Sequence, residues 1–242
     1  MAAQGADILD VGGESTRPYS DPVTADVELS RVMPVIEAIT SRLSIPISID
    51  TSKAVVARQA IEAGAEIIND VTALSGDPQM IDLARATHAG VCVMHMRGTP
   101  QTMQDNPAYA DVVHEVLEFL RRRRDTLLEQ GLVSGQISLD PGIGFGKSHA
   151  HNVELLAHAY RLHELGCPVL IGHSRKGFIG KVLGDKNADP MSGTIGVALA
   201  LASQGVQVLR VHDVGQVRQA LILYEATGGL LHDLPRNSPQ GS

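Results

Sequence analysis

Three short apolar segments of this 242-residue sequence end in a side chain that can bind a polar ligand: Asp50, Asn69 and Asp140. In a parallel β/α barrel the carboxyl ends of the strands meet at one mouth, so these side chains would share a pocket. Carboxylates and an amide oxygen suit a ligand edge rich in N–H donors. A single Asp there is more often a helix cap, but three such groups at one rim favour a ligand site.

Basic side chains follow the last two segments of the same kind. Lys176 lies in HSRKGFIGK, and Arg210 and His212 lie in RVHD, where barrels often bind phosphate. Cations opposite carboxylates predict a ligand with a polar, base-like end and an anionic end. The glycines of LDPGIGFGK would let a ligand approach the backbone, although their spacing matches no phosphate-binding fingerprint.

Histidines could instead bind a metal, as in barrel hydrolases. His149 and His151 have a suitable spacing, but they follow the glycine-rich loop, where an extended strand face is not expected. We therefore give a metallohydrolase little weight, and we interpret His95 as a structural residue.

The elements that must position these residues alternate between strand and helix. Helical patterns separate seven apolar runs of strand character, and the core is aliphatic, with 43% hydrophobic residues, 3% aromatics and no Trp. This pattern predicts an α/β fold of the TIM (β/α)8 type, for which about 250 residues is a typical length. The runs begin at Leu9, Ile47, Ile67, Val91, Ile137, Val169 and Val208.

A closed barrel of this type has eight strands, and glycine punctuation indicates which one is lacking. We expect a left-handed glycine to end the helix before each strand, at Gly5, Gly64, Gly90, Gly131, Gly166 and Gly205. Only Met1 to Gln4 precede Gly5, so we expect the first strand and most of the first helix to be missing, which leaves unpaired strand edges at 9–11 and 208–211. We expect one barrel domain over residues 1–227 and a mobile tail over 228–242.

Composition excludes several classes of function. A net charge of -7 disfavours a nucleic-acid or anionic-membrane surface. The run Arg121 to Arg124 falls in a helical stretch, 111–130, and is interpreted as a solvated face. Cys92 and Cys167 are expected to be reduced and buried, and there is no signal peptide or membrane span, so a cytoplasmic protein is expected.

Seven ordered motifs resemble those of the dihydropteroate synthase family. They are DVGGESTRP, ISIDTSK, IINDV, VMHMRGTPQTMQ, LDPGIGFGK, GHSRKGFIG and RVHDV, spread between about Gly5 and Thr227. The resemblance implies a transferase of folate biosynthesis that joins p-aminobenzoate to (7,8-dihydropterin-6-yl)methyl diphosphate, giving 7,8-dihydropteroate and diphosphate.

The same resemblance assigns roles to the candidate residues. Asp50, Asn69 and Asp140 would bind the pterin edge, and Lys176 would reach its acceptor side and frame the aminobenzoate site. Arg210 would pack on the pterin and, with His212, hold the diphosphate. The group expected to do the chemistry is Lys176, Arg210, His212 and Asp140. The residues expected around p-aminobenzoate are Thr16, Arg17, Pro18, Phe145 and Ser174.

Other family properties are carried over as expectations. The family uses Mg²⁺, but its segment of the form LNVTPDSFSDGG, which holds the Asn ligand, is absent from this sequence, so we name no metal ligand and expect pterin recognition to outlast catalysis. Tyr19 stands where the family often has Gly. A homodimer and competition by sulfonamide-type analogues of p-aminobenzoate are expected. Two alternatives stay open: a pterin-binding methyltetrahydrofolate:corrinoid methyltransferase and a non-catalytic pterin-binding paralogue.

Overall fold

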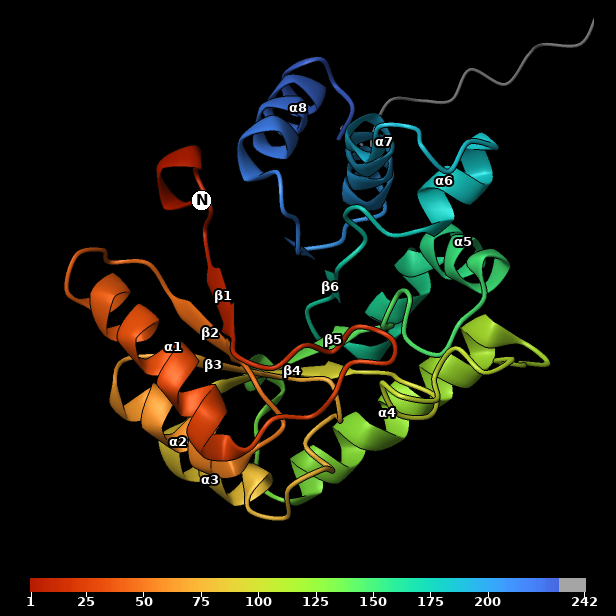
Figure 1. Ribbon diagram of the computed structural model, residues 1–242. Helices are drawn as coiled ribbons and strands as arrows, with labels where there is room; N and C mark the ends of the chain where they lie inside the picture. The colour runs from red at the N-terminus through yellow and green to blue at the C-terminus, as the bar shows by residue number, and fades with distance from the viewer. Residues whose placement is uncertain (231–242) are drawn as a thin grey trace, which may run out of the picture.

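The computed structural model describes residues 1–230 and consists of seven short strands alternating with helices (Figure 1). The strands are β1 (Leu9–Gly12), β2 (Ile47–Asp50), β3 (Ile67–Asp70), β4 (Gly90–Met94), β5 (Ile137–Asp140), β6 (Leu170–Ile171) and β7 (Val208–Leu209). The α-helices are α1 (Ala25–Thr40), α2 (Ala54–Glu62), α3 (Met80–Thr87), α4 (Val112–Glu129), α5 (His149–Ala157), α6 (Phe178–Leu183), α7 (Pro190–Ser203) and α8 (Val214–Ala226). Three 3-10 helices complete the described chain: η1 (Ala2–Gln4), η2 (Ser134–Gln136) and η3 (Ala159–Leu165).

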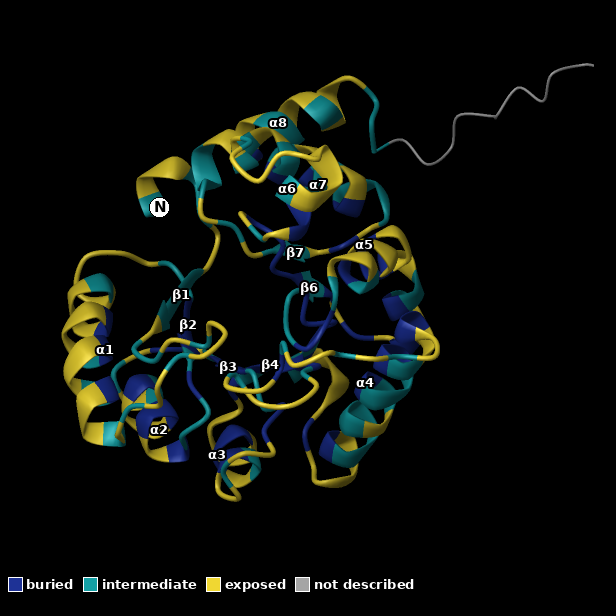
Figure 2. Cartoon of the chain, turned by 45° about the vertical axis from the view of Figure 1, so that its right-hand side comes forward, coloured by how far each residue is buried: buried dark blue, intermediate teal, exposed yellow. Residues whose placement is uncertain are grey.

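All strand pairs are parallel and join neighbours in the sequence. β1 to β5 form one sheet in that order, β6 pairs with β7, and a single bridge between Leu139 and Val169 connects the two sheets. The wall therefore runs from β1 to β7 with helices outside it, as Figure 2 shows. The seven predicted strands and the alternating α/β fold are confirmed, although β6 and β7 are only two residues long.

The wall has two edges among residues 1–230. There β1 pairs only with β2 and β7 only with β6. Side chains cross from one edge to the other: Arg218 of α8 donates to the carbonyl oxygen of Gly5 at 3.0 Å, so η1 and α8 lie side by side (Figure 1). The predicted unpaired edges are therefore present, and contacts of single side chains span them.

Side-chain caps fix where several helices begin. The side chain of Asp111 accepts from the N–H of His114 at 2.9 Å, and that of Ser148 accepts from the N–H of His151 at 3.2 Å. Each cap satisfies an N–H that the helix itself leaves free. His149 and His151 therefore lie in the first turn of α5 and not on an extended face, as expected.

Left-handed glycines end helices at most of the predicted positions. Gly90 is the exception, because it begins β4, and His88 takes the left-handed position after α3 with φ 55°. Only two residues, His88 and Ala89, connect α3 to β4, so the left-handed position falls on His88 and not on Gly90. The glycines with positive φ that follow helices as predicted are Gly5, Gly64, Gly131, Gly166 and Gly205.

The core is aliphatic, as the composition predicts. Ile49, Ile68 and Leu139 have no exposed surface, because parallel strands are covered on both faces. The expected solvated face of α4 is only partly correct. Arg123 donates to the carbonyl of Ala73 and Arg124 to that of Leu165, so these half-buried arginines satisfy carbonyls that neighbouring segments leave unpaired.

Two further features concern the chain as a whole: its membrane-crossing potential and its C-terminal end. Within residues 1–230 no helix has both the length and the apolar character that a membrane crossing requires. Helix α8 ends at Ala226, one residue before the expected end of the barrel domain. The structure describes three residues of the predicted tail, 228–230, and positions 231–242 of that tail lie outside the described residues.

Candidate functional site

Strand register brings the predicted ligand-binding side chains to one end of the sheet. Asp50 on β2 lies opposite Asn69 on β3, and Asp140 on β5 lies opposite Met94 on β4. Asp50 is half-buried, whereas Asn69 and Asp140 are each 8% exposed. The three side chains that the sequence placed at strand ends therefore lie at the carboxyl end of β2, β3 and β5 in one parallel sheet, and we call this end of the sheet the mouth.

Arg210 binds two of the acidic side chains at the mouth. Its Nε lies 2.6 Å from Oδ2 of Asp10, and its Nη2 lies 3.2 Å from Oδ2 of Asp50. Asn69 donates from Nδ2 to Asp10 at 3.3 Å. Arg210 follows the short strand β7, so these contacts reach from the last strand of the wall to its first two.

Burial disfavours the ionised form of the carboxyl groups at the mouth. It raises the pKa of Asp50 to about 7, with the nearby charge of Asp10 adding to the rise and Arg210 opposing it. Burial also raises the pKa of Asp140, while the charge of Lys176 opposes that rise. A ligand that donates N–H groups to these carboxylates would supply hydrogen bonds that favour the ionised form.

Lys176 and Phe145 approach each other from different loops. The Nζ of Lys176 donates to the carbonyl of Ile143 and lies 4.9 Å from the centre of the Phe145 ring. Burial lowers the pKa of Lys176 to about 8, and the charge of Asp140 opposes this effect. The structure thus joins the lysine of SRK to the glycine-rich loop.

Ser174 and His212 also meet, after β6 and β7. Oγ of Ser174 lies 3.1 Å from Nδ1 of His212 and accepts from the N–H of His212 at 3.3 Å. Burial lowers the pKa of His212, and the charges of Arg175 and Arg210 lower it further. Both effects favour the neutral form of the His212 imidazole.

The loop after β1 reaches over to the loop after β4. Thr16 is half-buried, and Arg17 and Pro18 are exposed. The next residue, Tyr19, has φ 63°; its N–H donates to the carbonyl of Pro100 at 3.0 Å, and its hydroxyl lies 3.3 Å from Asp105. The left-handed backbone explains why glycine would suit this position.

Comparison with known proteins gives a consistent result. A family model described as pterin binding enzyme matches residues 1–212. The dihydropteroate synthase of Escherichia coli K12 is 43% identical over 227 residues, which cover 94% of this chain and 80% of that protein. The chain belongs to the dihydropteroate synthase family. Two solved structures of family members align closely with this chain. The Yersinia pestis enzyme with a sulfonamide drug has a TM-score of 0.88 and 41% identity, and the alignment covers 93% of this chain and 82% of that chain. The Xanthomonas albilineans enzyme with 4-aminobenzoic acid has a TM-score of 0.87 and 44% identity, and the alignment covers 93% of this chain and 81% of that chain.

Among residues 1–230 no site fits the Mg²⁺ that is expected from the dihydropteroate synthase family. Residues 1–230 hold no group of three His, Cys, Asp or Glu side chains that could bind one metal ion. Two carboxylates on the first two strands, Asp10 and Asp50, are both bound to Arg210. We therefore derive no step of the reaction through a metal.

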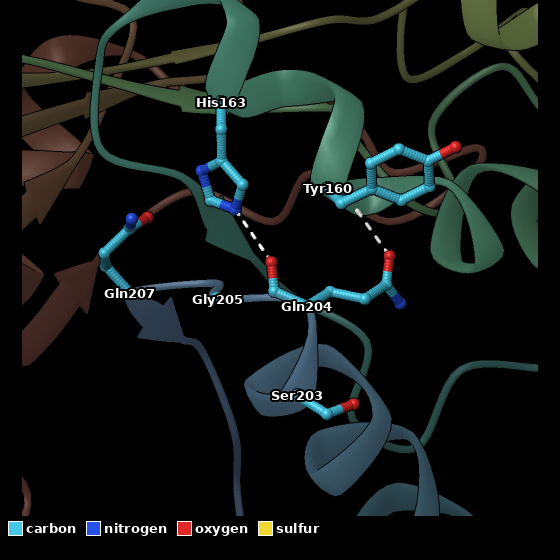
Figure 3. Close-up of a pocket in the computed structure, with 6 residues that line it drawn as sticks. All are labelled: Tyr160, His163, Ser203, Gln204, Gly205 and Gln207. Atoms are coloured by element: carbon cyan, nitrogen blue, oxygen red, sulfur yellow. Dashed lines mark hydrogen bonds between the residues drawn. The ribbon is translucent and has the colours of Figure 1, made fainter. Parts of the chain in front are cut away.

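A hollow of about 520 Å³ lies at the other end of the strands (Figure 3). Its lining includes Gly205 and Gln207, which precede β7, whereas the residues of the mouth follow the strands. The polar groups bind one another: Nε2 of His163 contacts the carbonyl of Gln204 at 2.9 Å, and the N–H of Tyr160 donates to the Gln204 side chain at 3.1 Å. None of the motifs shared with the dihydropteroate synthase family lines this hollow.

Two residues of the mouth were not among the sequence candidates. Asp10 is the second residue of β1, opposite Ser48 on β2, and its carboxylate contacts Arg210 and Asn69. Lys147 closes the glycine-rich motif and is buried, which no pattern in the sequence indicated. Both lie beside the predicted residues of the dihydropteroate synthase site.

Proposed function

We propose that this chain forms 7,8-dihydropteroate and diphosphate from (7,8-dihydropterin-6-yl)methyl diphosphate and p-aminobenzoate. The observation that carries the proposal is the convergence of Asp50, Asn69 and Asp140 at one mouth, with Lys176 and Arg210 beside them. Membership of the dihydropteroate synthase family supports the same reaction.

The pterin is proposed to bind at the buried carboxylates. Its 2-amino and ring N–H groups would donate to Asp50 and Asp140, and Asn69 would complete the edge. Lys176 would donate to the acceptor side of the ring. Each carboxylate would then gain partners that offset the cost of its burial, so pterin binding lowers the pKa of Asp50 and releases a proton from it.

Arg210 is proposed to exchange partners when the pterin arrives. A guanidinium and the donor edge of a pterin present similar N–H groups, and Arg210 already binds Asp50 through one of them. The pterin would replace that bond, and Arg210 would turn to its face and to the diphosphate. His212, beside it, would become protonated when the anionic diphosphate group binds, because that negative charge raises the pKa of His212.

p-Aminobenzoate is proposed to lie near Phe145 and Ser174, beneath the loop that carries Thr16, Arg17 and Pro18. The C–O bond between the pterin methylene and diphosphate breaks, the amine nitrogen forms a C–N bond to that methylene, and the nitrogen then loses a proton. The positive charge of Arg210 favours departure of diphosphate. The loops exclude water, which would otherwise compete as a nucleophile.

Two further expectations accompany this function. The sulfonamide drug in the Yersinia pestis structure and the 4-aminobenzoic acid in the Xanthomonas albilineans structure support the expectation that sulfonamide-type analogues compete with p-aminobenzoate for this chain. A homodimer and a cytoplasmic location stay predictions from the sequence.

The test is product formation from both substrates. Purified protein, dihydropterin diphosphate and p-aminobenzoate should yield dihydropteroate, measured by chromatography, and an equal amount of diphosphate. The variant K176M should lose this activity, and K186M, at an exposed lysine, should keep it. Binding of the pterin diphosphate without any product, even in a chain to which an LNVTPDSFSDGG-like segment has been added, would support a non-catalytic paralogue. Methyl transfer from methyltetrahydrofolate to a corrinoid would support the methyltransferase. Either result would overturn the proposal.

A further inference from the structure

Lys147 is a buried lysine in the segment between β5 and α5. Only 2% of its surface is exposed, and its Nζ contacts four acceptors. Two belong to the loop after β4: Nδ1 of His95 at 2.8 Å and the carbonyl of His95 at 3.2 Å. Two belong to the glycine-rich loop after β5: the carbonyl of Gly142 at 3.0 Å and that of Phe145 at 2.9 Å.

No acidic partner accounts for this buried amine. Among residues 1–230 Lys147 forms no ion pair, and burial lowers its pKa to about 7, while the nearby charge of Asp140 opposes the effect. The pKa of His95 is lowered to about 3 by burial and by Lys147, so His95 is neutral and its Nδ1 can accept from Nζ. A methionine would fill the same space without the cost of burying an amine, so the hydrogen bonds to the two loops are what the lysine provides.

The four contacts lead directly to residues of the proposed site. The N–H of Gly142 donates to Oδ1 of Asp140 at 2.7 Å, and the carbonyl of Gly142 accepts from Lys147. A Cβ on Gly142 would lie 2.0 Å from the carbonyl oxygen of His95, so the two loops touch at this point. Phe145, whose carbonyl also accepts from Lys147, places its ring 4.9 Å from Nζ of Lys176.

We propose that Lys147 is a positioning residue for the reaction at the mouth. Its amino group joins the loops after β4 and β5, and it thereby fixes Asp140 toward the pterin and Phe145 toward p-aminobenzoate. Lys147 touches neither substrate. This inference rests on the proposed function, because it assigns Asp140 and Phe145 the roles given there.

The variant K147M tests the proposal, with K186M as the matched control at an exposed lysine. Misplacement of the groups at an active site by about 1 Å can lower the catalytic efficiency, kcat/KM, by up to roughly 100-fold. We therefore expect K147M to raise KM for both substrates by about 10- to 100-fold, to weaken p-aminobenzoate binding in calorimetry, and to be partly rescued in K147R, whose guanidinium can donate to the same carbonyls. K186M should match the wild type.

A folded K147M protein with wild-type KM for both substrates would overturn the proposal. Should K147M fail to fold, H95F weakens the same contact from the other loop, since it removes one of the four acceptors and keeps a ring against Phe119. It should raise both KM values by a smaller factor, and unchanged values would again overturn the proposal. Absence of product from the wild-type protein would instead count against the proposed function, so the two failures are distinguishable.

Discussion

Replacement of Asp50 by Asn should change how stability depends on pH. Asp50 has its pKa raised to about 7 in the folded protein, from an ordinary value of 3.8, chiefly because it is buried. The folded state therefore holds a proton that the unfolded chain has lost between these pH values, so the free energy of unfolding falls as pH rises through this window. An asparagine has nearly the same shape and does not titrate.

The size of the effect follows from the two pKa values. One pKa unit corresponds to about 1.4 kcal/mol, and the window between pH 5 and pH 8 contains about two units of the difference. The wild type should therefore lose about 3 kcal/mol of unfolding free energy relative to D50N over that range. The unfolding free energy of D50N minus that of the wild type should therefore be larger at pH 8 than at pH 5.

Urea unfolding of both proteins at pH 5 and pH 8 measures this difference, because groups distant from Asp50 titrate alike in the two chains. D21N, at an exposed aspartate, is the matched control and should show no widening of the gap to the wild type. A difference between D50N and wild type that stays constant, or that shifts in favour of the wild type at pH 8, would refute the reasoning that burial raises the pKa of Asp50.

Three further predictions concern ligands. Affinity for 6-hydroxymethyl-7,8-dihydropterin, measured by calorimetry, should be highest between about pH 7, where Asp50 ionises, and about pH 8, where Lys176 loses its proton. D50N should not lose affinity on the acidic side of this maximum, and K176M should not lose affinity on the alkaline side. A wild-type affinity that does not change with pH would contradict both assignments. R210M should lose the preference for the diphosphate ester over the alcohol by about 1.5–3 kcal/mol in competition binding, whereas an unaltered preference would show that Arg210 does not hold the diphosphate. Y19F removes the hydroxyl that contacts Asp105 and should weaken p-aminobenzoate binding by about 1 kcal/mol with the pterin affinity unchanged; equal losses for both ligands would refute a local role of the loop.

The sequence predicted the parts of the site that depend on single strands. Asp50, Asn69 and Asp140 could be identified because each ends an apolar run, and parallel pairing aligns such ends. The seven strands and most helix ends followed from hydrophobic periodicity and glycine. His88 was missed as the end of α3 because a non-glycine residue adopts the left-handed conformation there.

Contacts between distant segments could not be predicted in this way. Arg210 and Asp10 are 200 positions apart, and Lys147 and His95 are 52 apart. Their pairing depends on how the loops pack at the mouth, which hydrophobic patterns do not encode. The half-buried Arg123 and Arg124 were interpreted as solvated for the same reason, since the carbonyls they bind belong to other elements.

Recognition of a pterin by the carboxylates of the mouth is the central claim, and one titration tests it most directly. 6-Hydroxymethyl-7,8-dihydropterin is titrated calorimetrically into the wild type and into D140N, whose amide oxygen can still accept from the N–H of Gly142 and so preserve the loop. Wild-type protein should bind one pterin per chain, and D140N should bind it about 10- to 100-fold more weakly because a hydrogen bond to a charged group is lost. Equal affinity of the two proteins, or no binding by the wild type, would contradict the claim.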